Sequence, residues 1–70
     1  MKKKKSILTK TEIKILAEVA RGISSKEIAV HLDISPHTVN VHCAHIMRKL
    51  NIHKRAQLVI YAIKNRIIKI

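Results

Sequence analysis

Apolar residues recur along this chain at intervals of three and four, the spacing that places side chains on one face of an α-helix. The pattern predicts four helices, over residues 10–21, 25–32, 36–50 and 55–66. No segment alternates between apolar and polar residues in the way that a half-buried strand would. The sequence therefore predicts an all-α protein, folded as a compact four-helix domain.

Three of the predicted helix starts share one local signature, in which a Ser or Thr cap is framed by two apolar residues five positions apart, a hydrophobic staple. The three sets are Leu8/Thr9/Ile13, Ile23/Ser24/Ile28 and Ile34/Ser35/Val39. Glu12 and Glu27 stand three residues after the first two caps, so each of these starts is expected to form a capping box. Pro36 opens the third helix, where its missing N–H is tolerated.

The second and third helices are separated by only three residues, 33–35, which leaves room for a sharp turn. Two helices joined in this way form a helix-turn-helix, whose second helix can enter the major groove of DNA. Gly22 is expected to end the first helix in the left-handed conformation, and Asn51 is a plausible left-handed stop for the third. The domain is thus predicted to be organised around a central helix-turn-helix.

The helical spacing also predicts which faces are buried. On the first helix the predicted buried residues are Ile13, Leu16, Ala17 and Ala20. On the third helix one stripe is predicted to face the core, and it consists of Val39, Cys43, Ile46 and Leu50. The opposite stripe is left free, and it consists of His37, Val41, Ala44 and Arg48.

Charge is segregated along the chain. The formal net charge is +11, yet every acidic residue lies at or before Asp33, and residues 34–70 carry seven basic residues and no acid. Such a balance indicates a polyanionic partner. Because Tyr61 is the only aromatic residue, the chain lacks the stacking platform that single strands and RNA loops usually require. Duplex DNA is therefore the favoured partner.

Other classes of function find little support in the residues. With one cysteine, Cys43, among its 70 residues, the chain cannot form an internal disulfide framework, and no cofactor or metal is expected. The five histidines cluster around the third helix, but adjacent helical positions point about 100° apart and do not converge on a metal ion. No catalytic constellation is credible, so we expect no enzyme activity. A single cysteine fits a reducing cytoplasm best. A transmembrane stretch is absent from the sequence.

Lys2 to Lys5 open the chain as a run of four basic residues. Residues 1–7 are interpreted as a basic, disordered arm; the alternative is an arm that touches phosphates.

Across residues 8–68 the chain resembles the LuxR-type (GerE-type) DNA-binding domain of bacterial transcription regulators. The matching segments are LTKTEIKILAEVARGISSKEIAVHLDIS, TVNVHCAHIMRKL and RAQLVIYA. The resemblance implies that residues 8–70 form one such domain, whose third helix reads the major groove and whose fourth helix pairs two domains on adjacent half-sites. It also implies action at the bacterial nucleoid, with RNA polymerase as a further candidate partner, and the chain length suggests a small stand-alone member of the family.

Carried over position by position, the resemblance places base contacts at Asn40, Val41 and Ala44. Ala44 departs from the long polar residues frequent in the family. Asn40 can pair with adenine and Val41 can contact a thymine methyl, so the residue types favour an A·T-rich half-site. Phosphate contacts are expected from polar residues near the helix starts and along the third helix. They are Ser25, Lys26, Thr38, His45, Arg48, Lys49 and Lys54.

The fourth helix carries two apolar stripes. The resemblance suggests that Leu58, Val59 and Ala62 belong to the core. It suggests that the other stripe is the dimer face, formed by Ala56, Ile60, Ile63 and Ile67. The alternative is that both stripes cover one broad core.

Two departures from the family pattern concern the ends of the fourth helix. Lys54 stands where a capping residue is frequent, so Gln57 is expected to lack its capping partner and the helix start to be less well fixed. Arg66 stands where glycine is common, so the helix is expected to run longer, with Asn65 as the nearby residue that tolerates a left-handed stop.

Two hypotheses from other classes remain at this point. One is an architectural protein that binds nucleic acid through charge alone. The other is a basic amphipathic peptide at anionic membranes, although such a peptide would need neither the ordered caps nor the sharp turn.

Overall fold

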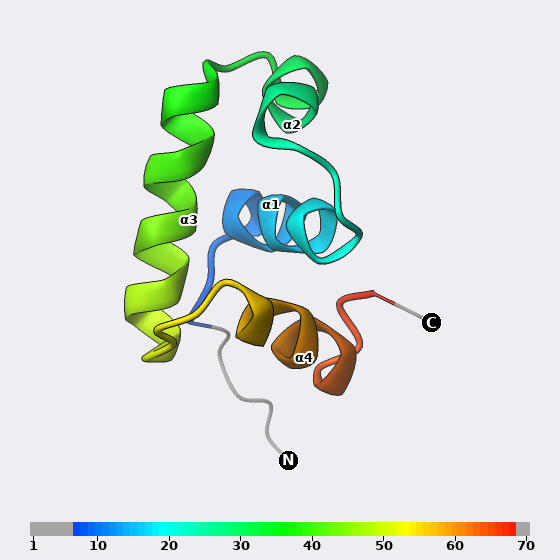
Figure 1. Cartoon of the computed structure of the whole chain (residues 1–70), viewed down its shortest axis with the longest axis vertical. Coiled ribbons are helices and arrows are strands. Elements are labelled where there is room, and N and C mark those ends of the chain that lie inside the picture. Colours follow the sequence, from blue (N-terminus) through cyan, green and yellow to red (C-terminus); the bar gives the residue numbers. More distant parts are fainter. Residues whose placement is uncertain (1–6, 69–70) are drawn as a thin grey trace.

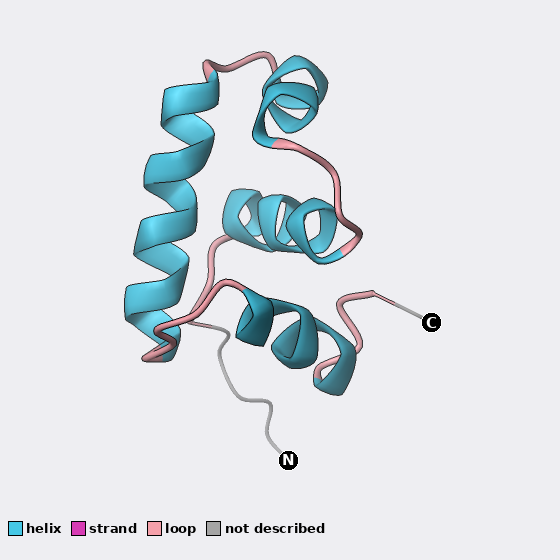
Figure 2. Ribbon diagram, in the orientation of Figure 1, coloured by secondary structure: helices cyan, strands magenta, loops and turns pink. Residues whose placement is uncertain are grey.

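The computed structural model describes residues 7–68, so the arm predicted at residues 1–7 lies outside the described part except for its last residue. Four helices follow one another: α1 (Lys10–Ala20), α2 (Ser25–Leu32), α3 (Pro36–Leu50) and α4 (Ala56–Lys64). The longest helix, α3, runs along one side of the molecule, and α2, α1 and α4 lie beside it in that order (Figure 1). The described residues form helices and loops without a strand (Figure 2), which confirms the all-α prediction.

The predicted caps form at all three staple-type helix starts. Thr9 Oγ1 accepts a hydrogen bond from the Glu12 N–H, and Glu12 Oε1 accepts one from the Thr9 N–H, so the first capping box is complete. Ser24 and Ser35 cap α2 and α3 in the same forward direction. The second capping box is not closed, because Glu27 lies exposed and only the bond to Ser24 forms. These bonds fix where each helix begins.

All four helices end through the same backbone motif. A residue in the left-handed conformation is followed by one whose N–H bonds to the carbonyl five residues earlier. The left-handed residues are Gly22, Asp33, Asn51 and Arg66. Asp33 therefore builds the turn of the helix-turn-helix, where the Ile34 N–H bonds to the Ala29 carbonyl at 3.0 Å.

The fourth helix is shorter than predicted. It begins at Ala56 and ends at Lys64, and Asn65 does not take the left-handed conformation (φ −98°). Arg66 takes it instead (φ 58°), and the chain turns back so that Ile68 is buried. Burial of this isoleucine outweighs the preference for asparagine at the stop. At the other end no side chain caps α4, as predicted. Gln57 Oε1 nevertheless accepts long hydrogen bonds from the His53 and Lys54 N–H groups, at 3.3 and 3.4 Å, so the helix start keeps a side-chain tie to the preceding loop.

One core joins the four helices. Its most deeply buried large side chains are Ile15, Leu16, Ile28, Val39, Ile46 and Leu58. The predicted core stripe of α3 is confirmed, with Leu50 half-buried at its end. On α1 the prediction was partly wrong: Ile15 and Val19 are buried, whereas Ile13, Ala17 and Ala20 are half-buried. The buried surface of α1 is broad because this helix packs against each of the other three.

Replacement of Arg66 by glycine is expected to stabilise the domain. A side chain in the left-handed region costs about 1–2 kcal/mol, and glycine avoids this cost while losing about 0.5–1 kcal/mol of chain entropy. The free energy of unfolding, measured in urea, should rise by about 0.5–1 kcal/mol. Arg66→Ala removes the charge and keeps the strained backbone, so it should not show this gain. An equal gain in both variants would contradict the argument.

Candidate nucleic-acid interface

The outer face of α3 is the centre of the candidate interface. Asn40, Val41 and Ala44 are all exposed, because the opposite stripe of the helix is packed into the core. The helix lies at the edge of the molecule, with no other helix on its outer side (Figure 1). The small side chains of Val41 and Ala44 leave the backbone of the helix open to close approach.

Most of the predicted phosphate contacts surround this face. Lys26 is exposed at the start of α2, and His45, Arg48 and Lys54 are exposed on or just after α3. Thr38 is half-buried, and its hydroxyl lies 2.9 Å from that of Ser35. The turn at residues 33–35 places α2 beside the start of α3, and Lys54 lies in the loop that follows the other end of α3.

Two residues predicted to contact different parts of DNA bond to each other. The Ser25 hydroxyl donates a hydrogen bond of 2.8 Å to Asn40 Oδ1, which links the start of α2 to the outer face of α3. Ser25 is half-buried and Asn40 is exposed. Sequence reasoning missed this bond because it joins residues 15 positions apart, and only the crossing of the two helices brings them together.

Lys49 has a structural partner. Its Nζ lies 2.7 Å from Glu12 Oε1, and the Glu12 side chain is almost fully buried. The hydrogen bond from Lys49 lowers the pKa of Glu12 below its ordinary value, and the backbone bond from Thr9 contributes. Glu12 was predicted only as a cap, yet it also ties the start of α1 to the end of α3. Lys49 is therefore less available to DNA than its neighbour Arg48.

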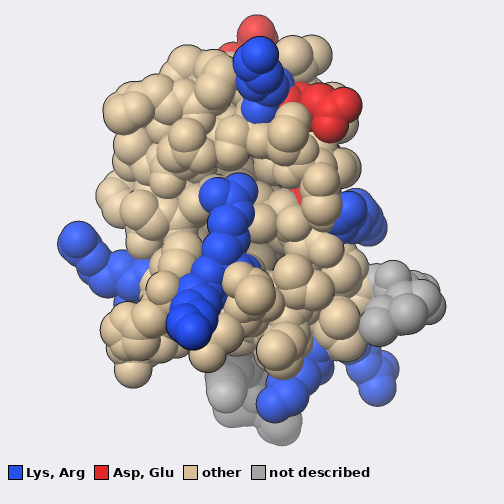
Figure 3. Space-filling model, in the orientation of Figure 1, with Lys and Arg blue, Asp and Glu red and all other residues tan. Residues whose placement is uncertain are grey.

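α3 itself carries no acidic residue, and the exposed Glu27 and Asp33 lie on α2 and in the turn that follows it. A hydrogen bond between His31 Nδ1 and Glu18 Oε1, 2.7 Å long, joins α2 to α1. In the face shown in Figure 3, acidic side chains gather at the upper end, where α2 lies, and most basic side chains lie below them. Since residues 34–70 carry no acid, α3 and α4 contribute only positive charge to the surface.

The structure separates the two apolar stripes of α4. Leu58 and Ala62 are fully buried, whereas Ile60 is 56% exposed and Ile63 is 37% exposed. Ala56 is exposed, whereas Ile67 lies beyond the end of α4, is half-buried and packs against the core. Of the predicted dimer face, Ala56, Ile60 and Ile63 are therefore uncovered in the single chain, and Ile67 is not.

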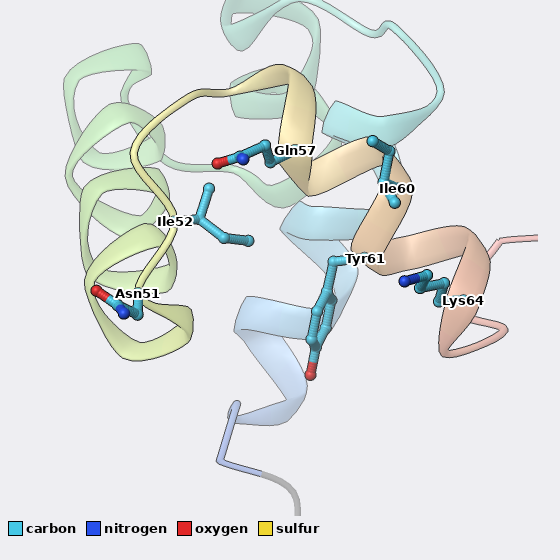
Figure 4. Close-up of a pocket in the computed structure, with 6 residues that line it drawn as sticks. All are labelled: Asn51, Ile52, Gln57, Ile60, Tyr61 and Lys64. Carbon is cyan, nitrogen blue, oxygen red and sulfur yellow. The ribbon is translucent and has the colours of Figure 1, made fainter.

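An open hollow borders this outer stripe of α4. Its lining residues are Asn51, Ile52, Gln57, Ile60, Tyr61 and Lys64. In Figure 4 the loop after α3 carries Asn51 and Ile52 on one side, and Ile60 and Lys64 project from α4 on the other. The exposed apolar surface thus continues from Ile60 towards the loop.

Neither the histidines nor the cysteine builds a reactive site in the part of the chain that the structure describes. No group of three His, Cys, Asp or Glu side chains there could hold a metal ion. Cys43 is buried, and burial raises the pKa of its thiol, so the neutral side chain acts as a small core residue. No helix within residues 7–68 is both long enough and apolar enough to span a membrane.

A sharp turn, a short supporting helix and a longer helix with an exposed, acid-free outer face define a helix-turn-helix DNA-binding domain. The family model described as "Bacterial regulatory proteins, luxR family" matches residues 6–62. The chain belongs to this family of DNA-binding transcription regulators, which is not an enzyme family. The resemblance noted from the sequence is thereby confirmed.

Individual relatives agree with this assignment. The oxygen regulatory protein NreC of Staphylococcus carnosus is 45% identical over 62 residues, which are 89% of this chain and 29% of NreC. The nitrate/nitrite response regulator protein NarP of Escherichia coli is 43% identical over 61 residues, 87% of this chain and 28% of NarP. A solved structure of transcription factor GerE superposes with a TM-score of 0.82 at 29% identity, over 93% of this chain and 97% of GerE. The chain thus spans less than a third of the length of NreC and of NarP.

The Glu12–Lys49 pair should make stability depend on pH. A carboxyl group whose pKa is lowered by folding stabilises the fold above its unfolded pKa, about 4.3, and this contribution disappears as the pH falls through the lowered value. Glu12→Gln keeps an acceptor for the Thr9 N–H but loses the ion pair. At neutral pH it should lower the free energy of unfolding by about 1–2 kcal/mol, a modest value because Lys49 is partly exposed.

Glu18→Gln is the matched control, because Glu18 pairs with the more exposed His31. Its effect should stay below about 1 kcal/mol. Urea unfolding between pH 3 and 7 compares the variants. If Glu12→Gln lost as much stability on acidification as the wild type, Glu12 would not be the group responsible.

Proposed function

We propose that this protein is a sequence-specific regulator of transcription that binds duplex DNA as a dimer, with α3 in the major groove of each half-site. The observation that carries the proposal is the outer face of α3, which is exposed, free of acids and bordered by the start of α2. A major groove about 12 Å wide accepts an α-helix of this kind. Such a protein would act at the nucleoid in the bacterial cytoplasm and alter the access of RNA polymerase to promoters.

Base recognition is assigned to Asn40, Val41 and Ala44. Asn40 offers polar groups to a base edge, Val41 can contact a thymine methyl group, and Ala44 allows the helix to approach closely. A short apolar side chain at position 44 also contributes no hydrogen bond of its own, so discrimination rests mainly on Asn40 and Val41.

Phosphate binding is assigned to the groups around this face. The free N–H groups at the start of α2, next to Ser25 and Lys26, form a favourable site for a phosphate. Thr38, His45, Arg48 and Lys54 are placed to hold the backbone on either side of the groove. Lys49 can contribute through the donors that Glu12 does not use, since its side chain is 39% exposed.

Dimerisation is assigned to the outer stripe of α4, formed by Ala56, Ile60 and Ile63. Ile67, the fourth residue predicted for this face, lies beyond the end of the helix and packs against the core. Isoleucines exposed on a domain of 70 residues favour burial against a second copy. A two-fold pair of domains would present two α3 helices to two half-sites of opposite orientation.

Removal of Arg48 should weaken DNA binding similarly on all sequences. A lost phosphate contact reduces affinity and lowers the slope of log affinity against log salt by about one. Arg21→Ala is the control, because it removes the same charge at the end of α1 that lies far from α3 (Figure 1). Fluorescence anisotropy over a range of salt concentrations measures both quantities. Equal effects of the two substitutions would favour binding by overall charge alone, the architectural alternative.

A charge on the outer stripe of α4 should uncouple the two half-sites. Ile60→Asp is expected to abolish cooperative binding to paired half-sites while the monomer stays folded, because Ile60 is 56% exposed. Ala62→Asp, at a fully buried position two residues further along on the other stripe, should unfold the domain. Binding to paired-site and single-site duplexes, together with circular dichroism, distinguishes the cases. Unfolding of Ile60→Asp would show that the stripe belongs to the core.

A further inference from the structure

We propose that Ser25 sets the base preference of Asn40, so that Asn40 acts as a hydrogen-bond donor in the major groove and favours guanine over adenine. This inference rests on the proposed function, because it assumes that α3 lies in the groove. It is carried by the 2.8 Å hydrogen bond from Ser25 Oγ to Asn40 Oδ1.

The hydrogen bond occupies the oxygen of the Asn40 amide and leaves its NH2 group free to bind a ligand. An asparagine amide has one acceptor oxygen and an NH2 group with two donors. The oxygen is held by the Ser25 hydroxyl, whereas the NH2 group has no partner among the described residues. Asn40 is exposed, so its donors are the half of the amide left for a ligand.

The edges of the purine bases respond differently to a donor. Guanine presents two neighbouring acceptors in the major groove, N7 and O6, whereas adenine presents the acceptor N7 beside the donor N6. The usual asparagine–adenine pair needs the amide oxygen to accept from N6 while the NH2 group donates to N7. Here adenine would compete with Ser25 for the oxygen, but guanine would not. The hydrogen bond therefore reverses the preference that the residue type alone suggests.

Ser25 can act in this way because another residue caps α2. The side chain of Ser24 accepts the hydrogen bond from the Glu27 N–H, which leaves the Ser25 hydroxyl free to serve Asn40. A hydroxyl has a single hydrogen to donate. Because Ser25 donates it to Asn40, the hydroxyl cannot donate to a phosphate at the same time. Replacement of Ser25 should thus change which base is preferred, whereas loss of a phosphate contact would weaken binding to all bases alike.

The test compares the wild-type chain of 70 residues with Ser25→Ala, Ser25→Thr and Asn40→Ala. Binding sites are first selected from random duplexes with the wild type. Dissociation constants are then measured for duplexes that carry each of the four bases at each selected position. The position at which Asn40→Ala loses discrimination is the one that Asn40 reads. Circular dichroism verifies that each variant folds, which we expect for both Ser25 variants because the Ser24 cap is retained.

At that position the wild type should prefer guanine. Ser25→Ala should shift the ratio of guanine to adenine affinity by roughly tenfold towards adenine, and Ser25→Thr, which keeps the hydroxyl, should keep the wild-type preference. A wild type that prefers adenine there would overturn the proposal, as would a uniform loss of affinity in Ser25→Ala. Failure of Asn40→Ala to alter discrimination anywhere would also overturn it. Selection of no consensus by the wild type would instead reject the proposed function itself.

Discussion

The structure depends on the packing of α1 against the other three helices. α2 and α4 have only eight and nine residues, and helices of this length are not stable alone in water. Each is stabilised by contact with α1, whose Ile15 and Leu16 side chains are completely buried. A chain of this size has only one small core to share, so the position of α3, and with it the candidate interface, follows from how α1 fills that core.

Two polar contacts fix the orientation of α3 against α2 and α1 more closely than the apolar packing does alone. Near the start of α3, Asn40 is bonded to Ser25 on α2; near its end, Lys49 is bonded to Glu12 on α1. Apolar packing alone leaves a helix some freedom to rotate and slide, whereas paired donors and acceptors fix its register. Both contacts use residues for which the sequence analysis predicted other roles, Asn40 as a base contact through the family resemblance and Lys49 as a phosphate contact. The candidate DNA-binding surface is thus shaped by the same bonds that hold the helix in place.

The features that could be predicted from the sequence are local ones. The caps at Thr9, Ser24 and Ser35 and the left-handed Asn51 depend on residues within one turn, so their patterns were sufficient. The partners of Ser25 and Lys49 could not be predicted, because they lie on other helices and depend on how those helices cross. The end of α4 was misplaced for a similar reason, since burial of Ile68 moved the left-handed residue from Asn65 to Arg66. The residue types of the candidate site were visible in the sequence, but not the hydrogen bonds between them.

The central claim is that the outer face of α3, supported by the start of α2, is the surface that meets duplex DNA. Titration of the 15N-labelled protein with a selected duplex, followed by amide chemical shifts, tests it most directly. We expect the largest changes at the first residues of α2 and along α3 from residue 37 to residue 48, with small changes at the C-terminal half of α1. Changes spread evenly over the basic residues of all four helices would contradict the claim and indicate binding by charge alone.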